Sequence, residues 1–418
     1  MIKNDAIKAA MAKTKARHKD MSCRVYVVKV TSGKLSHEKE NHIKGLFTEA
    51  KWLRNAVVGS GDAFAFDRGA KSVPVKVGCE FEDRVFRVIG SQMKQDIVDS
   101  VKSEIRGLAT KKAKGEKVGG LKFKSYCNSV PLRQYGTTYR IDFDKGTISI
   151  QGLKKPIKVR GLKQIPGNTE IANAKLIRKP SGLYFHITTY CDKEETALTG
   201  ATVGIDFGIR ANMTLSTGEE INITVPETKS VKRNSKAVNK SLVKSGRKKG
   251  ANHRKRVHEL QIAYEKQTNK KRDFANKAVS KLLREYDFIA IQDEMIANWH
   301  KGLFGKQVQH SAMGFIKAKL GTNSKVHVVA RDFPSTQKCP VCEKNTKHPL
   351  ELRHFKCGHC GYCHHSRDVK SAGMILSKAL KQVCVERTAK GLVEAGTTTA
   401  RPRAGGKFPP VKQEAQLL

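Results

Sequence analysis

The feature that most constrains the fold is a pair of Cys-x-x-Cys motifs in the last quarter of the chain. Cys339 and Cys342 form the first pair, Cys357 and Cys360 form the second, and 14 residues lie between the pairs. Each motif is a tight turn that directs two thiolates to one point, and a loop of this length lets both turns complete the tetrahedron that Zn²⁺ prefers. The sequence therefore predicts a structural zinc site, because a catalytic zinc keeps an open position and usually has histidine ligands.

The other cysteines and the hydropathy indicate the compartment. The chain has ten cysteines, of which five lie within 25 residues and five are scattered. A secreted disulfide framework is shorter and more evenly spaced, so we expect a reducing compartment with one metal site. No apolar run of ~20 residues and no signal peptide stand out, and we expect no membrane association.

The charge of the chain indicates its partner. The sequence has 80 Lys plus Arg against 38 Asp plus Glu, a formal net charge of +42. An excess of this size repels itself unless a polyanion offsets it, so nucleic acid is the expected partner. An aromatic content of 6% favours phosphate contacts over base stacking. The Lys- and Arg-dense stretch 228–272 fits phosphate contact, although such runs are also typical of a solvated helix face.

The first half of the chain has the pattern of β-structure with a helical insertion. Residues 22–30 are rich in β-branched and aromatic side chains and predict a strand. Apolar residues recur at helical spacing over 42–58 and 91–109. From about 120 to 195 the sequence again predicts strands, including two hairpins, the second of which turns near Gly182.

The second half has a different order of elements. From residue 201 the pattern predicts strand, strand, basic helical stretch, strand, helix, strand, cysteine motifs and helix. This alternation is typical of an α/β domain with a mixed sheet. The tail from about 386 is rich in Gly, Thr, Pro and Lys, which predicts disorder. The expected fold class is therefore α/β plus β, in several domains.

Three acidic residues stand at the ends of elements in this second half. Asp206 lies in a predicted strand with the wording GIDFG, Glu294 ends the predicted strand IAIQDE, and Asp368 lies in the first turn of the last predicted helix. Such acids can converge to hold two Mg²⁺ ions for in-line attack on a phosphodiester. Taken singly, each has a plainer explanation: a turn former, a solvated strand end and an acid that is favourable at a helix N-terminus.

Together these motifs resemble those of a known family. GIDFGI, the QDE strand with NWHKG after it, the CPVC and CGHC pairs and RDVKSA are similar to motifs of TnpB, the RNA-guided nuclease of bacterial insertion sequences, which is related to the compact type V CRISPR effectors. The resemblance is strongest over about 200–385, and the N-terminal strand, helical insertion and β-module follow the order of the family.

The resemblance implies a bilobed fold, with a wedge-like β-barrel carrying an inserted helical recognition bundle and a RuvC nuclease domain of the RNase H fold with an inserted zinc ribbon. The implied β-barrel covers residues 1–200, with its insertion at about 36–115. RuvC covers 201–335 and resumes at 364–385, after the zinc ribbon at 336–363, which is implied to bind target nucleic acid. A disordered tail follows at 386–418.

The resemblance also implies the residues of the active site. Asp206 matches the first RuvC acid and Asp368 the third. For the middle acid, a gapless match places Gln292 at the glutamate of the family, whereas a shift of two residues places Glu294 there. We prefer Glu294, because it keeps an acid on the same strand face. The expected catalytic and magnesium-binding residues are therefore Asp206, Glu294 and Asp368.

The chain departs from the family pattern at three other positions. Ser366 replaces the first acid of the usual Asp-Arg-Asp, and Lys370 and Met374 stand where the family commonly has asparagine. The acid missing at Ser366 is not one that we assign to metal. These departures weaken the inference of nuclease activity without removing it.

The function that the resemblance implies is RNA-guided DNA endonuclease activity, which cuts target DNA next to a short adjacent motif by two-metal hydrolysis. The expected partners are a guide RNA, transposon-derived or CRISPR-derived, and double-stranded target DNA. The expected particle is a monomeric ribonucleoprotein in the bacterial cytoplasm that is nucleoid-associated when bound. The helical positions Lys51, Arg54 and Gln92 are candidates for reading DNA bases.

Two alternatives stay open. A nuclease-inactive RNA-guided repressor is favoured by Ser366 and by the uncertain register at Gln292, while the presence of Asp206 and Asp368 counts against it. A DNA-binding transposition accessory protein without guide RNA would need only the zinc ribbon and the positive charge.

Overall fold

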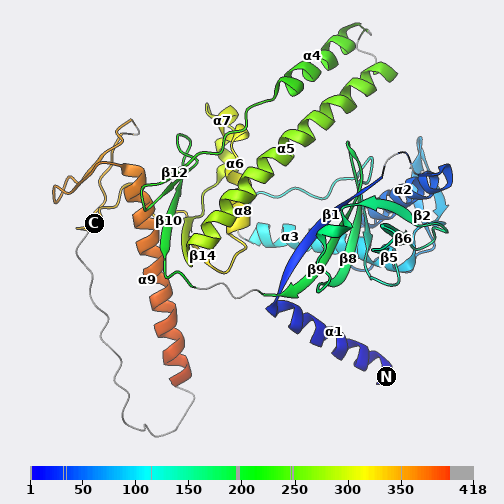
Figure 1. The fold of residues 1–418 in the computed structure, drawn as a ribbon, viewed down its shortest axis with the longest axis horizontal. Coiled ribbons are helices and arrows are strands. Elements are labelled where there is room, and N and C mark those ends of the chain that lie inside the picture. Colours follow the sequence, from blue (N-terminus) through cyan, green and yellow to red (C-terminus); the bar gives the residue numbers. More distant parts are fainter. Residues whose placement is uncertain are drawn as a thin grey trace. The chain divides into compact units, whose positions relative to one another are not determined.

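The computed structural model describes residues 2–395, except 32, 34, 114, 194–197, 245, 247, 248 and 350. The chain divides into two compact units, Met1–Glu195 and Thr196–Leu418, whose elements can be followed along the chain in Figure 1. The first unit begins with an exposed basic helix, α1 (Ile2–Asp20). Among the described residues, no helix is both long and apolar enough to cross a membrane.

A strongly curved antiparallel sheet forms the body of the first unit. Its seven strands lie in the order β4 (Ser129–Leu132), β8 (Glu170–Lys179), β9 (Gly182–Asp192), β1 (Met21–Val30), β7 (Ile157–Arg160), β6 (Thr147–Ile150) and β5 (Tyr139–Asp142). The Tyr139 hydroxyl of β5 donates a hydrogen bond to the Ala172 carbonyl in β8 at 3.0 Å. The last strand of the order, β5, therefore approaches β8, the second strand from the other end. The sheet is nearly closed and barrel-like.

The strands predicted in this half are present. β1 covers the predicted strand 22–30, and the two predicted hairpins are β5–β6 and β8–β9. The second hairpin turns at Gly182, whose φ of 130° is open to glycine but strained for other residues. The side chains on the concave face, among them Val28, Leu176 and Phe185, are fully buried in one apolar core.

The insertion between β1 and β4 holds two long helices and a hairpin. Its elements are α2 (His37–Gly59), β2 (Ser72–Val77), β3 (Glu80–Val85) and α3 (Ser91–Ala113). Both helices were predicted, whereas the β2–β3 hairpin between them was not. The β2–β3 hairpin turns at Gly78, with φ of 66°, and its residues are mostly exposed. A hairpin that buries so few side chains has a weak apolar alternation in its sequence.

A mixed five-stranded sheet forms the core of the second unit, as the sequence predicted. Its order is β12 (Glu220–Ile221), β11 (Met213–Leu215), β10 (Thr202–Phe207), β13 (Phe288–Gln292) and β14 (Val326–Val329). β10, β13 and β14 are parallel to one another, whereas β11 and β12 run antiparallel to their neighbours. Parallel strands end at the same edge of a sheet, which decides where the residues that follow β10 and β13 lie.

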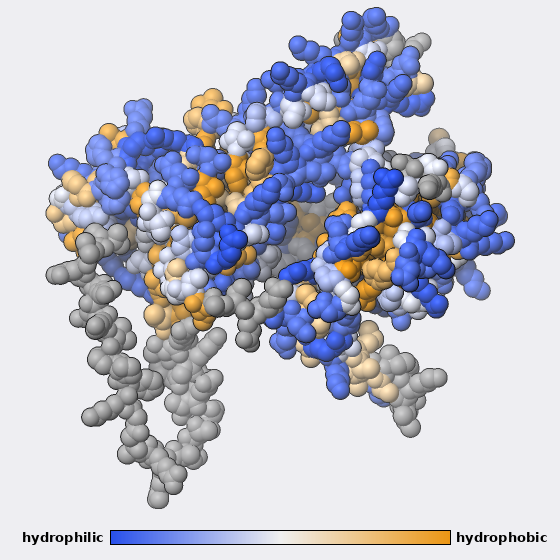
Figure 2. Space-filling model, viewed as in Figure 1, coloured by the Kyte–Doolittle hydropathy of each residue, from blue (hydrophilic) through white to orange (hydrophobic). Residues whose placement is uncertain are grey.

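Helices occupy the connections of this sheet. Between β12 and β13 lie α4 (Lys229–Lys244) and α5 (Ala251–Glu285), and between β13 and β14 lie α6 (Ile296–Trp299), α7 (Gly305–His310) and α8 (Met313–Leu320). α4 and α5 pack on each other as a long hairpin (Figure 1). Its surface is largely hydrophilic in Figure 2, as the basic stretch 228–272 predicts.

The last part of the chain carries the cysteine motifs and the final helix. A small hairpin of β15 (Phe355–Lys356) and β16 (Cys363–His364) leads into α9 (Arg367–Ala395). α9 packs against β10, β13 and β14.

The predicted end of the last segment at 385 is too early, because the helix continues to Ala395. This extension contains Ala, Lys, Leu and Glu, which are strong helix formers. The rest of the predicted tail, 396–418, lies outside the described residues.

Candidate functional site

The four cysteines of the two motifs converge on one point. Their sulfur atoms all lie within 4.8 Å of one another. Cys339 Sγ is 3.6 Å from Cys360 Sγ, and Cys342 Sγ is 3.5 Å from Cys357 Sγ. A zinc tetrahedron with Zn–S bonds of about 2.3 Å has sulfur–sulfur edges of about 3.8 Å. The donor set and its spacing therefore fit a four-coordinate Zn²⁺.

Hydrogen bonds around the second motif stabilise the ionised form of Cys357. The N–H of His359 points at Cys357 Sγ at 3.4 Å, and the Thr346 hydroxyl lies 3.7 Å from the same atom. Hydrogen bonds from the backbone at Cys360 and His359 lower the pKa of Cys357 to about 5. Gly361, with φ of 75°, turns the chain back so that Cys357 N–H donates to the Tyr362 carbonyl at 2.7 Å.

The acid of β10 lies on the face of the sheet that α9 covers. Val203, Ile205 and Phe207 point to the opposite, apolar side, so alternation along the strand directs Asp206 toward α9. Burial raises the pKa of Asp206 to about 7, and the charges of Asp368 and Glu294 raise it in the same direction. Asp368 and Glu294 are therefore each close enough to act electrostatically on Asp206.

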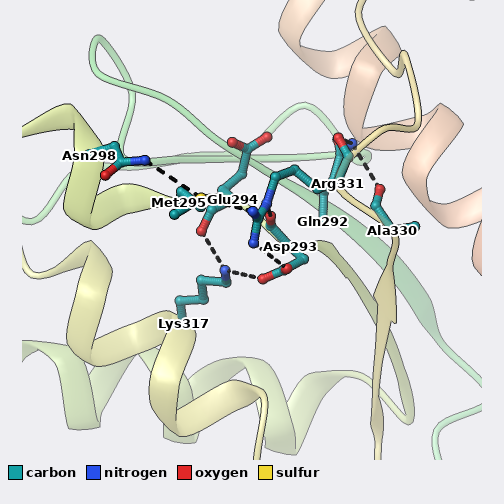
Figure 3. A network of polar contacts seen from close by, with 8 residues as sticks. All are labelled: Gln292, Asp293, Glu294, Met295, Asn298, Lys317, Ala330 and Arg331. Atoms are coloured by element: carbon teal, nitrogen blue, oxygen red, sulfur yellow. Dashed lines mark hydrogen bonds and ion pairs between the residues drawn. The ribbon is translucent and has the colours of Figure 1, made fainter. Parts of the chain in front are cut away.

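The three residues after Ile291 have different surroundings (Figure 3). Gln292 is 4% exposed, and its amide donates to the carbonyls of Ala330, Arg331 and Phe333 at 3.2, 3.1 and 2.6 Å. This side chain is fully engaged in holding the segment after β14, because an amide nitrogen has only two hydrogens to share. Gln292 therefore lies in a structural contact rather than among the acids.

Asp293 and Glu294 also differ from each other. Asp293 forms ion pairs with Lys317 at 2.8 Å and Arg331 at 2.8 Å, which hold its pKa below the usual value. Figure 3 shows the Glu294 carboxylate directed away from Lys317. Burial raises the pKa of Glu294, and Lys317 and Arg331 lower it. Of the acids after β13, Glu294 is the one whose charge acts on Asp206.

The third acid comes from the start of α9. Asp368 is 27% exposed, and the guanidinium groups of Arg353 and Arg367 lie 3.8 and 3.9 Å from its carboxylate. Both distances lie at the limit for an ion pair, so neither guanidinium neutralises the carboxylate strongly. Asp206 and Glu294 sit at the carboxyl edge of parallel strands, where α/β sheets bind ligands, and Asp368 faces the same edge from α9.

The acids are spaced more widely than the cysteines. Among the described residues, only the four cysteines form a set of three or more potential ligand side chains within 4.8 Å of one another. Carboxylates repel each other without a cation, and the charges of Asp368 and Glu294 add to the larger effect of burial in raising the pKa of Asp206. Carboxylate oxygens are the ligands that Mg²⁺ prefers, and the unneutralised negative charge fits a divalent cation.

A buried network that was not predicted from the sequence connects these two sites. Lys370 is 4% exposed and Ser371 is fully buried. The Lys370 ammonium donates to three carbonyls just before Cys339, and Ser371 Oγ lies 2.9 Å from Ser335 Oγ. Burial lowers the pKa of Lys370 to about 8. The available signal was a lysine on the otherwise apolar face of the last predicted helix.

One of the candidates for reading DNA bases is not available for that role in this structure. The Arg54 side chain is 8% exposed and pairs with Glu104 at 2.6 Å between α2 and α3. Gln92 donates to the Gln134 side chain at 2.9 Å. A helical spacing pattern indicates that a residue lies on a helix, but it does not tell which face the neighbouring helix covers.

Comparisons with known proteins match most of the second unit and the last residues of the first unit. Residues 185–301 match a family model described as "Probable transposase" of the OrfB IS605 type, and residues 313–375 match one described as "Cas12f1-like, TNB domain". A protein of Streptomyces pristinaespiralis named "Putative RNA-guided DNA endonuclease" is 28% identical over 268 residues. That match covers 62% of this chain and 65% of the relative, so the chain spans somewhat less than two thirds of the relative's length.

The two family models include all seven predicted site residues. Asp206 and Glu294 lie in the first matched range, whereas Asp368 and the four cysteines lie in the second. Together with the Streptomyces relative, these matches confirm the resemblance of the chain to the TnpB family.

Proposed function

We propose that the chain is an RNA-guided DNA endonuclease of the TnpB type. The observation that carries the proposal is the approach of three acids at the carboxyl edge of parallel strands. The charges of Glu294 and Asp368 both act on the buried Asp206. The formal net charge of +42 supports a polyanionic partner. The name of the Streptomyces relative supports the guide RNA and the DNA target.

In this proposal the two metal sites have separate roles. Cys339, Cys342, Cys357 and Cys360 would hold one Zn²⁺ that fixes the fold of the zinc ribbon, 336–363, since all four positions are thiolates and none is left open. Asp206, Glu294 and Asp368 would hold two Mg²⁺ ions. Bound there, Mg²⁺ would supply the positive charge that stabilises the attacking and leaving oxygens of a phosphodiester.

The protein itself contributes orientation and charge. β10 and β13 present Asp206 and Glu294 from a rigid sheet, and α9 presents Asp368. Lys317 and Arg331 form ion pairs with Asp293. These ion pairs keep the two cations from pairing directly with the Glu294 carboxylate. The raised pKa of Asp206 means that this group releases a proton when a cation binds near neutral pH.

The remaining parts of the chain would bind the nucleic acids. The nearly closed sheet of the first unit, its insertion and the basic α4–α5 hairpin would hold guide RNA and target DNA mainly by phosphate contacts. RuvC remains our assignment for 201–335 and 364–385, and the wedge-like barrel for 1–200. Binding of RNA should weaken steeply as the salt concentration rises, because each neutralised phosphate releases counterions.

The test is cleavage of a plasmid in Mg²⁺ by the protein co-expressed with its flanking RNA. The plasmid carries a guide-matched target behind a randomised flank. Asp206→Ala, Glu294→Ala and Asp368→Ala should each lower the cleavage rate by 10²-fold or more, on the order of a lost catalytic metal ligand. Asp332→Ala removes an exposed acid of the segment after β14, and this control should cut within a few-fold of the unaltered protein.

Other outcomes would favour other functions. Guide-dependent DNA binding without cutting in any divalent metal would support the RNA-guided repressor. DNA binding that survives RNase treatment and needs no RNA would support the transposition accessory protein.

A further inference from the structure

Lys370 lies two residues after Asp368 on α9 and contacts the segment before the cysteine cluster and the core of that cluster. Its ammonium has three hydrogens, and it donates hydrogen bonds to the carbonyls of Ser335, Thr336 and Lys338 at 2.9, 2.9 and 3.0 Å. An ammonium has no further donor. All three ammonium hydrogens of Lys370 are therefore donated to segment 335–338, which leads directly into Cys339.

The same cation lies against the core of the cysteine cluster. The Lys370 ammonium is 4.0 Å from the centre of the Phe355 ring. Phe355 is fully buried and packs with Cys339 and Cys357. A cation over an aromatic face is stabilised most where water is excluded. The position of Lys370 thus depends on the fold of the cluster on one side and on the segment before it on the other.

On the other side, Lys370 belongs to the first turns of α9, together with Asp368. Its neighbour Ser371 lies 2.9 Å from Ser335 through the two hydroxyl oxygens, and Ser335 donates to Gln292 Oε1 at 2.9 Å. Ser371 also lies near the Asp206 carboxyl, whose pKa it lowers against the larger effect of burial. The start of α9 is therefore fixed through segment 335–338, and with it the position of Asp368.

Charge gives the lysine a second role. A Zn²⁺ with four thiolates carries a net charge of about −2, and three carboxylates carry about −3 when ionised. Both clusters act on Lys370, through Cys339 and through Asp206. A buried positive charge between two negative clusters offsets both, and without it their mutual repulsion would push the start of α9 away from the ribbon.

We propose that Lys370 is a positioning residue that couples occupancy of the cysteine cluster to cation binding at the acids. When the cluster loses its metal, the turn at Cys339 loosens and Lys370 loses its three fixed acceptors, so Asp368 and Ser371 move away from Asp206. The acid site rests on the proposed function, whereas the coupling can be measured without guide RNA or DNA.

Thermodynamic linkage gives a test on the unaltered protein. If zinc in the cluster favours cation binding at the acids, a cation at the acids must raise the zinc affinity of the cluster by the same factor. The full-length, zinc-loaded protein is titrated with Mn²⁺, followed by its electron paramagnetic resonance, and the equilibrium release of zinc to a competing chelating dye is measured with and without saturating Mg²⁺. We expect several-fold tighter zinc binding with Mg²⁺, and no such change in Asp206→Ala.

Variants then assign the coupling to Lys370. Lys370→Met keeps the length of the side chain without its charge, and should weaken Mn²⁺ binding about tenfold and abolish the effect of Mg²⁺ on zinc release. Lys370→Arg keeps the charge but not the three-carbonyl geometry, and should restore part of the coupling. Lys381→Met is the matched control, since Lys381 lies on the same helix and pairs with Glu343 of the ribbon at 2.7 Å, yet is 64% exposed.

The outcomes separate the two proposals. Zinc release that ignores Mg²⁺ in the unaltered protein, or a Lys370→Met protein with unchanged linkage, overturns the coupling. If Lys370→Met does not fold, the unaltered protein and Lys370→Arg still decide the question. Intact linkage in a protein that never cuts DNA would instead overturn the proposed nuclease and leave the coupling standing.

Discussion

Gly204 of β10 and Ala372 of α9 meet backbone to backbone. A Cβ built on Gly204 would overlap the Ala372 carbonyl oxygen and come within 2.9 Å of Leu376 Cβ. The helix that carries Asp368 therefore sits as close to the strand that carries Asp206 as a glycine allows. The distance between the two acids depends on this contact.

The first prediction follows from that contact. Gly204→Ala should push α9 off the sheet, because a helix carbonyl cannot move aside as a flexible side chain can, and should lower the free energy of unfolding by roughly 1–3 kcal/mol, as overpacking does. DNA cleavage should fall with it. Thermal unfolding measures the stability. The control is Gly373→Ala, which alters the residue directly after Ala372 on α9. A Cβ built on Gly373 has no atom within 4 Å, so this substitution should be neutral or should stabilise the protein by up to about 1 kcal/mol. Equal effects of both substitutions would contradict the packing explanation.

A second prediction concerns Gln292, the alternative position for the middle acid. Gln292→Glu would place a carboxylate against the carbonyl oxygens of Ala330, Arg331 and Phe333, which now accept hydrogen bonds from the amide. Replacing a donor by an acceptor in a buried site costs on the order of 1–3 kcal/mol or more. We expect a lower unfolding midpoint and no gain in cleavage. A more active Gln292→Glu protein would show that Gln292 occupies the position of the metal ligand.

The third prediction is a pH dependence of stability. The pKa of Asp206 is about 7 in the folded protein against 3.8 for the ordinary group, so the folded state binds the proton more tightly between these values. The contribution of this residue to stability is therefore complete below about pH 4 and is lost as the pH rises toward 7, at up to about 1.4 kcal/mol per pH unit.

Asp206→Asn removes this titration. In buffer without added Mg²⁺, the unfolding midpoint of the variant should exceed that of the unaltered protein at pH 8, and the difference should shrink toward pH 5. Added Mg²⁺ should raise the midpoint of the unaltered protein at pH 8 and leave the variant nearly unchanged. A difference between the two proteins that is constant from pH 5 to 8 would mean that the carboxyl is not perturbed.

The fourth prediction concerns the cysteines. Cys339→Ser removes a buried thiolate of the cluster and should abolish stoichiometric zinc and expose the Phe355 core to solvent, because binding and folding of small metal modules are coupled. Cys363→Ser is the control three residues beyond the second motif, since the Cys363 sulfur is exposed and donates to the Gly361 carbonyl at 3.3 Å. Metal analysis of both proteins measures the effect. Loss of zinc in Cys363→Ser would mean that the ligand set is different.

The sequence by itself determined the local elements and the cysteine cluster. β-Branched runs and apolar spacing identified β1, α2, α3 and the strands of the second unit, because burial on one face leaves a period in the sequence. The two Cys-x-x-Cys motifs are short-range turns, so their geometry is set within a few residues of each ligand. The described residues of the basic stretch 228–272 likewise are largely helical and mostly exposed or half-buried, as the composition indicates.

Only the tertiary structure decided the surroundings of the acids. Gln292, Asp293 and Glu294 are neighbours in the sequence, yet one is bound by backbone carbonyls, one by Lys317 and Arg331, and one acts on Asp206. The partners of Gln292 and Asp293 come from residues 24–41 positions further along the chain, and Asp206 lies 88 positions before Glu294, so no local period encodes these contacts. The same holds for Lys370, whose burial is set by three carbonyls more than 30 residues away. Side-chain surroundings depend on contacts between distant segments, whereas periodicity reports only which face of an element is buried.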